Sequence, residues 1–129
     1  MSAPTRVVST VGPVLIIGSG LLGASLGLAL RAGGVRVYLE DASPTSLRLA
    51  SDVGAGVAFG DAIDEAGVAY ADAGTDAPGY EAPRIVVVAT PPDVADRVIV
   101  DSLLRFPRCD RHGRRLGEGR GRRRRARDA

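Results

Sequence analysis

The sequence predicts an α/β fold built on a parallel, doubly wound β-sheet. Residues 14–17 and 85–89 are short, wholly apolar and mostly β-branched runs, which are typical of strands buried on both faces of a sheet. Helical segments separate these runs, and the resulting order β-α-β-α-β-β-α is the pattern of doubly wound sheets.

Each element has its own signal. Residues 21–32 are mostly Ala, Leu and Ser, with a Gly33-Gly34 stop, and predict a helix. Residues 35–39 alternate apolar with polar and predict a second strand, after which Ser43-Pro44 is an N-cap and first-turn proline for a helix over residues 44–52. Residues 57–59 predict a short third strand, and residues 93–104 have apolar side chains at helical spacing. Residues 60–84 predict at most one weak helical turn at 62–66.

Composition and charge divide the chain of 129 residues into two parts. Hydrophobic residues make up 45% and charged residues 25%, which is close to the average for globular proteins. Residues 1–107 contain 7 Arg and 12 acidic residues, a net charge of −5, whereas residues 108–129 contain 10 Arg and 3 acidic residues, a net charge of +7. We therefore expect a half-domain over residues 1–107 and a disordered Arg-rich tail over 108–129.

The same features restrict the class of protein. The high isoelectric point reflects the tail alone, and this tail has no aromatic residue or apolar period, so specific nucleic-acid binding is not expected. No run of about 18 apolar residues is present, and the N-terminus lacks the layout of a signal peptide. These observations predict a cytoplasmic protein without a membrane span, and no metal site is expected.

The most specific motif is a glycine-rich turn with the form G-x-G-x-x-G. It follows the first predicted strand and opens the first helix, the context that a Rossmann-like dinucleotide-binding fold requires. The first glycine permits the tight turn, the second lets a pyrophosphate approach the backbone, and the third lets the helix pack on the sheet. The motif consists of Gly18, Ser19, Gly20, Leu21, Leu22 and Gly23.

Two further sites complete a candidate cofactor crevice. Glu40 and Asp41 follow Gly18 by 22 and 23 residues, where an acid accepts hydrogen bonds from the adenosine ribose. Such an acid repels the extra phosphate of NADP, so NAD is favoured, although Arg48 lies one helical turn further on. Thr90 and Pro91 follow the fourth strand, which borders the same crevice.

Taken together, these segments resemble the N-terminal half of bacterial prephenate dehydrogenases. The similarity covers residues 13–107 and rests on VLIIGSGLLGASLGLAL, the Asp41 strand end and RIVVVATPPDVADRVIVDSLLRFP. The resemblance implies an oxidoreductase that converts prephenate to 4-hydroxyphenylpyruvate with NAD, on the route to tyrosine. It also implies a homodimer for the intact protein, and a catalytic histidine in a later G-x-H-P-type motif.

That continuation is absent, and the chain reads CDRHGRRLGEGRGRRRRARDA instead. With suitable codons, reading Cys109 to Glu118 one base later gives A-T-V-T-D-V-G-S-V-R, close to the family's A-x-V-T-D-V-G-S-V-K. We therefore expect a truncated chain with an out-of-frame tail, in which His112 is not the catalytic histidine and no catalytic residue is present. The isolated chain is then expected to be inactive, and its fourth strand to be an open edge.

Two alternatives remain at this point. The glycine turn also occurs in other NAD(P)-dependent dehydrogenases and reductases, among them β-hydroxyacid-type dehydrogenases and pyrroline carboxylate reductases. The second alternative is a non-catalytic nucleotide-binding module with a basic tail. A histidine-proline motif downstream in the restored frame would indicate the prephenate enzyme.

Overall fold

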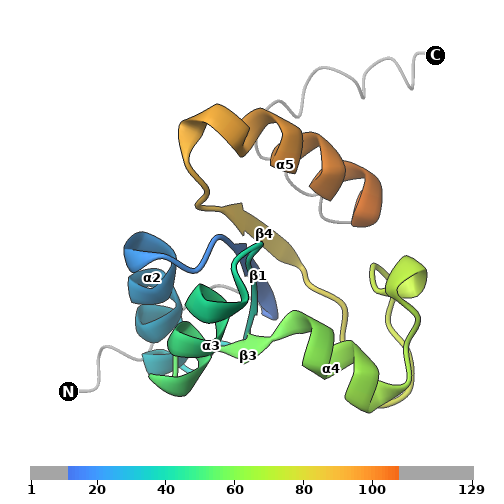
Figure 1. Ribbon diagram of the computed structural model, residues 1–129. Coiled ribbons are helices and arrows are strands. Elements are labelled where there is room, and N and C mark those ends of the chain that lie inside the picture. Colours follow the sequence, from blue (N-terminus) through green and yellow to red (C-terminus); the bar gives the residue numbers. More distant parts are fainter. Residues whose placement is uncertain (1–11, 108–129) are drawn as a thin grey trace, which may run out of the picture.

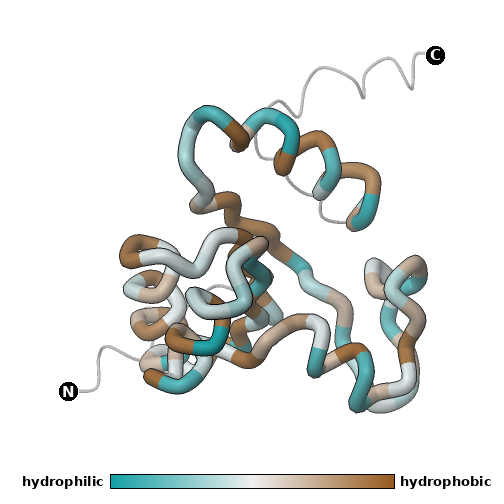
Figure 2. Tube along the Cα trace, viewed as in Figure 1, coloured by the Kyte–Doolittle hydropathy of each residue, from teal (hydrophilic) through white to brown (hydrophobic). Residues whose placement is uncertain are grey.

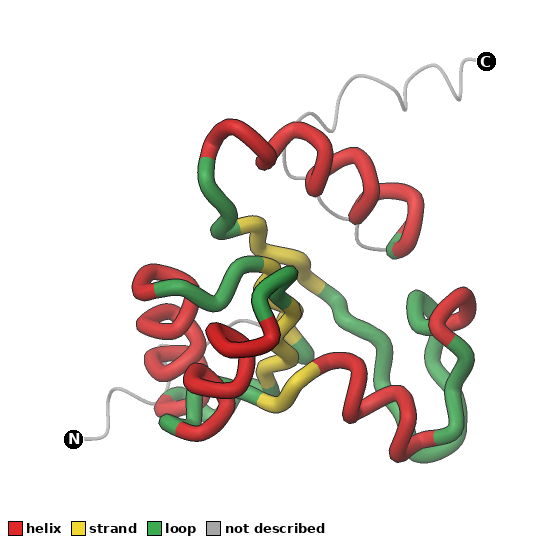
Figure 3. The backbone as a smooth tube through the Cα atoms, in the orientation of Figure 1, coloured by secondary structure: helices red, strands yellow, loops and turns green. Residues whose placement is uncertain are grey.

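The computed structural model describes residues 12–107, which form an α/β fold with one four-stranded, all-parallel sheet flanked by helices (Figures 1 and 3). The strand order is β3-β2-β1-β4, which is the strand arrangement of an incomplete Rossmann-like fold. The strands are β1 (Val14–Ile17), β2 (Val37–Glu40), β3 (Val57–Ala58) and β4 (Ile85–Val88). The helices are α2 (Leu21–Ala32), α3 (Pro44–Asp52), α4 (Phe59–Ala66), the short 3₁₀ helix η1 (Tyr70–Asp72) and α5 (Pro92–Arg105).

The expected strands and helices are confirmed, with small shifts at their ends. β1 lies at the centre of the sheet, and its Val14 is in register with Val37 of β2 and Ile85 of β4. β2 begins two residues later than expected, at Val37, and extends to Glu40. The order places β4 at one edge of the sheet, as expected.

Both faces of the sheet are covered, which explains why β1 has no polar residue. Val14 and Ile16 point to one face, where they pack with Leu39 and the inner residues of α2 and α3. Leu15 and Ile17 point to the other face and pack with a cluster that includes residues from α4 and the end of α5. Figure 1 shows α2 and α3 on one side of the strands and α4 on the other. Figure 2 shows hydrophobic and hydrophilic residues alternating along α5, as expected for a helix with one apolar face.

Residues 60–84 contain more regular structure than the sequence indicates. The expected single turn is a two-turn helix, α4, that starts at Phe59 and ends at Gly67 in the left-handed conformation (φ 73°). Phe59 therefore belongs to this helix and not to the third strand. Phe59 and Ile63 lie one turn apart and are both buried in the core cluster that contains Leu15. Burial of this pair stabilises the helix.

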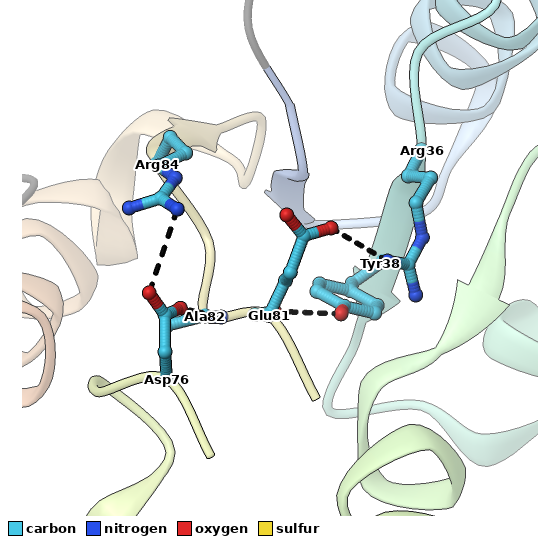
Figure 4. A network of polar contacts seen from close by, with 6 residues as sticks. All are labelled: Arg36, Tyr38, Asp76, Glu81, Ala82 and Arg84. Atoms are coloured by element: carbon cyan, nitrogen blue, oxygen red, sulfur yellow. Dashed lines mark hydrogen bonds and ion pairs between the residues drawn. The ribbon is translucent and has the colours of Figure 1, made fainter. Parts of the chain in front are cut away.

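Polar contacts attach the segment between η1 and β4 to the sheet (Figure 4). The hydroxyl of Tyr38 donates a 2.8 Å hydrogen bond to the carbonyl of Glu81, whose carboxylate pairs with Arg36 at 2.8 Å. Asp76 accepts a 2.8 Å hydrogen bond from the backbone N–H of Ala82. The Tyr38 and Arg36 contacts join this segment to β2 and the residue before it, and the Asp76 contact lies within the segment.

Several sequence-based expectations lie outside the described residues. They concern the Arg-rich tail at 108–129, the out-of-frame motif at Cys109 to Glu118, and His112. Within residues 12–107, no helix is long and apolar enough to cross a membrane.

Candidate functional site

A cleft of about 950 Å³ opens at the carboxyl ends of β1, β2 and β4. In open parallel sheets, ligands bind at the carboxyl ends of the strands, between two neighbouring strands whose following helices lie on opposite faces of the sheet. In this sheet that point lies between β1, which leads into α2, and β4, which leads into α5. The cleft is lined by Ile17, Gly18, Gly20, Leu21, Leu22, Asp41, Ala42, Ser46, Ala89, Thr90, Pro91, Val94, Arg97, Val98 and Asp101.

Two motif glycines are required by the packing of the protein itself. Gly18 has a φ of +106°, and a Cβ there would lie 2.7 Å from the carbonyl oxygen of Ala89, the residue that follows β4. A Cβ on Gly23 would collide with the carbonyl oxygen of Gly18. These two positions therefore fix how closely α2 approaches the end of β1.

Gly20 differs from both, because no protein packing requires a glycine there. A Cβ on Gly20 would have no protein atom within 4 Å, and its backbone is extended, with φ −73° and ψ −160°. Gly20 is the N-cap of α2 and lines the cleft. It supplies no side-chain cap, and the first turn of α2 has no acidic residue, so the N–H groups at this helix end are available to an anion.

Asp41 joins the glycine loop to the start of α3. Its Oδ2 accepts hydrogen bonds from both the backbone N–H of Ser19, at 2.6 Å, and the Ser19 hydroxyl, at 2.9 Å. Its Oδ1 accepts a 2.7 Å hydrogen bond from the backbone N–H of Ser43, the N-cap of α3. Partial burial opposes ionisation, but these three hydrogen bonds together outweigh it and hold the pKa of Asp41 below its usual value. The cleft therefore presents a carboxylate at neutral pH.

The adjacent acid, Glu40, does not line the cleft. Its Oε1 lies 3.1 Å from the Arg105 guanidinium at the end of α5, an ion pair that lacks hydrogen-bond geometry. The sequence leaves both acids as candidates, and the structure brings only the Asp41 carboxylate to the glycine loop, which Glu40 contacts through its backbone carbonyl.

The residues that follow β4 form the opposite side of the cleft. Thr90 and Pro91 both line it, and the hydroxyl oxygen of Thr90 is buried without a hydrogen-bond partner among the described residues. A buried hydroxyl without a partner is costly unless water or a ligand satisfies it. This side of the cleft therefore offers one hydrogen-bonding group next to apolar surface.

Seven of the nine candidate residues line the cleft directly, and the other two support it. Ser19 is 4% exposed and binds Asp41, and Gly23 packs on Gly18. Sequence reasoning missed the contribution of α5, which lines the cleft with Val94, Arg97, Val98 and Asp101. Their i, i+3, i+4, i+7 spacing marks one helix face and was the available signal. Arg48 is exposed and is not among the lining residues.

The sheet and this site define the class of protein: an α/β protein with an incomplete Rossmann-like fold. Its sequence is 59% identical over 44 residues to "Probable prephenate dehydrogenase NovF" from Streptomyces niveus. The matched segment covers 34% of this chain and 12% of the length of that relative. No family model and no solved structure matches the chain.

Proposed function

We propose that this chain binds NAD in the cleft and is the coenzyme-binding part of a prephenate dehydrogenase. The observation that carries the proposal is the environment of Gly20. Its missing side chain is explained neither by backbone conformation nor by protein packing, but it leaves the backbone open at the cleft. Close approach of a pyrophosphate is the remaining reason for glycine at the second position of the motif.

The residues present fit each part of a dinucleotide. The uncapped end of α2, at Gly20, Leu21 and Leu22, offers N–H groups and a partial positive charge to the pyrophosphate. The carboxylate of Asp41 accepts a hydrogen bond from the adenosine ribose. Thr90 and Pro91 border the nicotinamide side, where the Thr90 hydroxyl has no hydrogen-bond partner among residues 12–107.

The proposal favours NAD over NADP because the ribose subsite is negatively charged. The extra phosphate of NADP would meet the ionised Asp41 at close range. The exposed Arg48, one turn into α3, does not line the cleft and is not placed to compensate for that repulsion.

The reaction assigned here is the oxidative decarboxylation of prephenate to 4-hydroxyphenylpyruvate. When bound, NAD accepts the hydride that leaves the substrate ring. The residues of this chain bind and orient the coenzyme, and none of them is assigned a catalytic role. We assign substrate binding to the part of a prephenate dehydrogenase outside the resemblance at residues 13–107.

A calorimetric titration of the full chain with NAD, NADH and NADPH tests coenzyme binding. We expect saturable binding of NAD and NADH, with weaker binding of NADPH. Absence of binding by all three nucleotides at millimolar concentration would contradict the proposal. The Gly20→Val variant is the matched control, since a side chain at Gly20 meets no protein atom but occupies the ligand's approach.

Sequencing the gene across codons 105–135 tests the prephenate assignment separately. A one-base change that restores a T-D-x-G-S-V motif, followed by a histidine-proline motif, supports a frameshifted prephenate dehydrogenase. A sound frame with no such continuation would instead favour a nucleotide-binding module.

A further inference from the structure

We propose that Ser19 is a positioning residue that fixes the Asp41 carboxylate and thereby sets the preference of the cleft for NAD over NADP. The inference rests on the proposed coenzyme site and assigns a role to a motif position that usually has none. In a G-x-G-x-x-G turn the residue between the first two glycines is unrestricted, so its side chain here is informative.

Asp41 already accepts three hydrogen bonds within the protein. An ionised carboxylate has about four acceptor positions. Ser19 fills two of these on Oδ2, through its N–H and its hydroxyl, and the Ser43 N–H fills one on Oδ1. One position on Oδ1 therefore remains for a ribose hydroxyl.

These contacts hold the Asp41 carboxylate rigidly. Ser19 is 4% exposed and comes from the β1–α2 loop, whereas Ser43 comes from the β2–α3 loop. The Ser43 hydroxyl in turn accepts a 3.2 Å hydrogen bond from the backbone N–H of Ser46. Asp41 is thus bonded from two loops, and the side chain cannot rotate without breaking bonds to both.

A rigidly held carboxylate discriminates between the two coenzymes. A fixed negative charge gives the largest penalty to a 2′-phosphate, because a free carboxylate would turn away from it. A fixed acceptor also gives the largest gain with a ribose hydroxyl, because no ordering is needed when the ligand binds. The Ser19 hydroxyl therefore raises NAD affinity and lowers NADP affinity through the same contact.

The test compares NADH and NADPH dissociation constants, by calorimetry, in the full chain and two variants. Ser19→Ala keeps the backbone N–H contact but removes the 2.9 Å hydroxyl contact. We expect NADH binding to weaken about fivefold, equivalent to one hydrogen bond of ~1 kcal/mol, and the NADH-to-NADPH preference to shrink by at least that factor. Ser19→Thr keeps the hydroxyl and is expected to restore the preference. Ser25→Ala, an exposed serine on α2, is the matched control.

A second measurement does not depend on any nucleotide. The pKa of Asp41, followed by carbon NMR of its carboxyl group, should rise in Ser19→Ala and return towards the wild-type value in Ser19→Thr. None of the variants substitutes the other ionisable residues that line the cleft, Arg97 and Asp101. NADH binding with an unaltered preference in Ser19→Ala would overturn the inference and leave the proposed function intact. Failure of the unaltered chain to bind either nucleotide would overturn both.

Discussion

The Arg105 guanidinium lies 3.1 Å from the Glu40 carboxylate and joins the end of α5 to the carboxyl end of β2. Arg105 also lies over the ring of Tyr70, 4.7 Å from its centroid, and over that of Phe106, at 4.9 Å. Its side chain is only 15% exposed. The ion pair directs the Glu40 carboxylate towards α5, whereas the Asp41 carboxylate contacts the glycine loop and lines the cleft.

The first prediction separates these two acids. Glu40→Gln should lower the free energy of unfolding by about 1 kcal/mol, because the mostly buried Arg105 guanidinium then keeps as counter-charge the more exposed Asp101 carboxylate, at 3.4 Å. It should leave NADH affinity unchanged, since Glu40 does not line the cleft. Asp41→Asn should weaken NADH binding at least fivefold. Urea denaturation and calorimetry measure the two effects, and equal loss of NADH affinity in both variants would contradict the assignment.

The second prediction contrasts two motif glycines. Gly20→Ala should change stability by less than about 0.5 kcal/mol, because the new methyl group meets no protein atom. The same variant should weaken NADH binding tenfold or more, since the methyl group projects where the pyrophosphate must approach. Gly23→Ala should destabilise the fold by several kcal/mol, because its Cβ collides with the Gly18 carbonyl. Thermal unfolding with and without NADH distinguishes the variants; a strongly destabilised Gly20→Ala would argue for a packing role.

Much of the fold follows from local sequence patterns, whereas the contacts of the site do not. The run at residues 14–17 is buried on both faces of the sheet, and the half-buried run at 85–88 packs against both core clusters, so their apolar composition identifies them as strands. The helix that begins at Phe59 was underestimated because Gly60 and Asp61 have low helix propensity, and tertiary burial of Phe59 and Ile63 overrides it. The Ser19–Asp41 contact joins residues 22 apart, and no local pattern specifies that their side chains meet.

The third prediction concerns acid stability. Asp41 has a lowered pKa in the folded protein, so its ionised form stabilises the fold above the pKa of the unfolded chain, about 3.9. This contribution is lost as the pH falls from about 4 through the folded pKa. The difference in unfolding free energy between the unaltered chain and Asp41→Asn should therefore shrink below pH 4. Denaturation at pH 7, 5 and 3 measures it, with Asp52→Asn as a control for removing one exposed charge. A difference that stays constant with pH would count against the hydrogen-bonded carboxylate.

The fourth prediction concerns Tyr80, whose ring stacks on that of Tyr38 in the core. The Tyr80 hydroxyl donates a 2.6 Å hydrogen bond to the Ala73 carbonyl, and burial raises the Tyr80 pKa well above its usual value. Tyr80→Phe should cost about 1–2 kcal/mol at pH 7 by leaving that carbonyl unsatisfied. Above pH 10, ionisation of Tyr80 stabilises the unfolded chain but not the folded chain. The free energy of unfolding therefore falls as the pH rises.

Removing the hydroxyl should therefore make stability less sensitive to pH above 10. Denaturation between pH 7 and 11 checks this, with Tyr70→Phe as a control at pH 7, since Tyr70 is 57% exposed. Equal stability of Tyr80→Phe and the unaltered chain at pH 7 would contradict the expected hydrogen-bond contribution.

The fifth prediction concerns Arg97, the basic side chain among the residues that line the cleft. It lies on α5, across from the glycine loop, and is exposed. A positive charge at this place attracts any dinucleotide, because every such ligand carries the pyrophosphate charge. Arg97→Ala should therefore weaken NADH and NADPH by the same factor, about three- to tenfold at low salt, with a smaller effect at 0.5 M salt.

Arg48→Ala is the matched control, because Arg48 is an exposed arginine outside the lining of the cleft. Its removal should leave both dissociation constants within twofold of the unaltered chain. If Arg97→Ala weakened NADPH binding but not NADH binding, Arg97 would be the residue that binds the 2′-phosphate. That result would contradict the expected preference of the unaltered chain for NAD. The same selective loss in Arg48→Ala would place the phosphate at the start of α3 instead, since Arg48 lies one turn beyond Ser43.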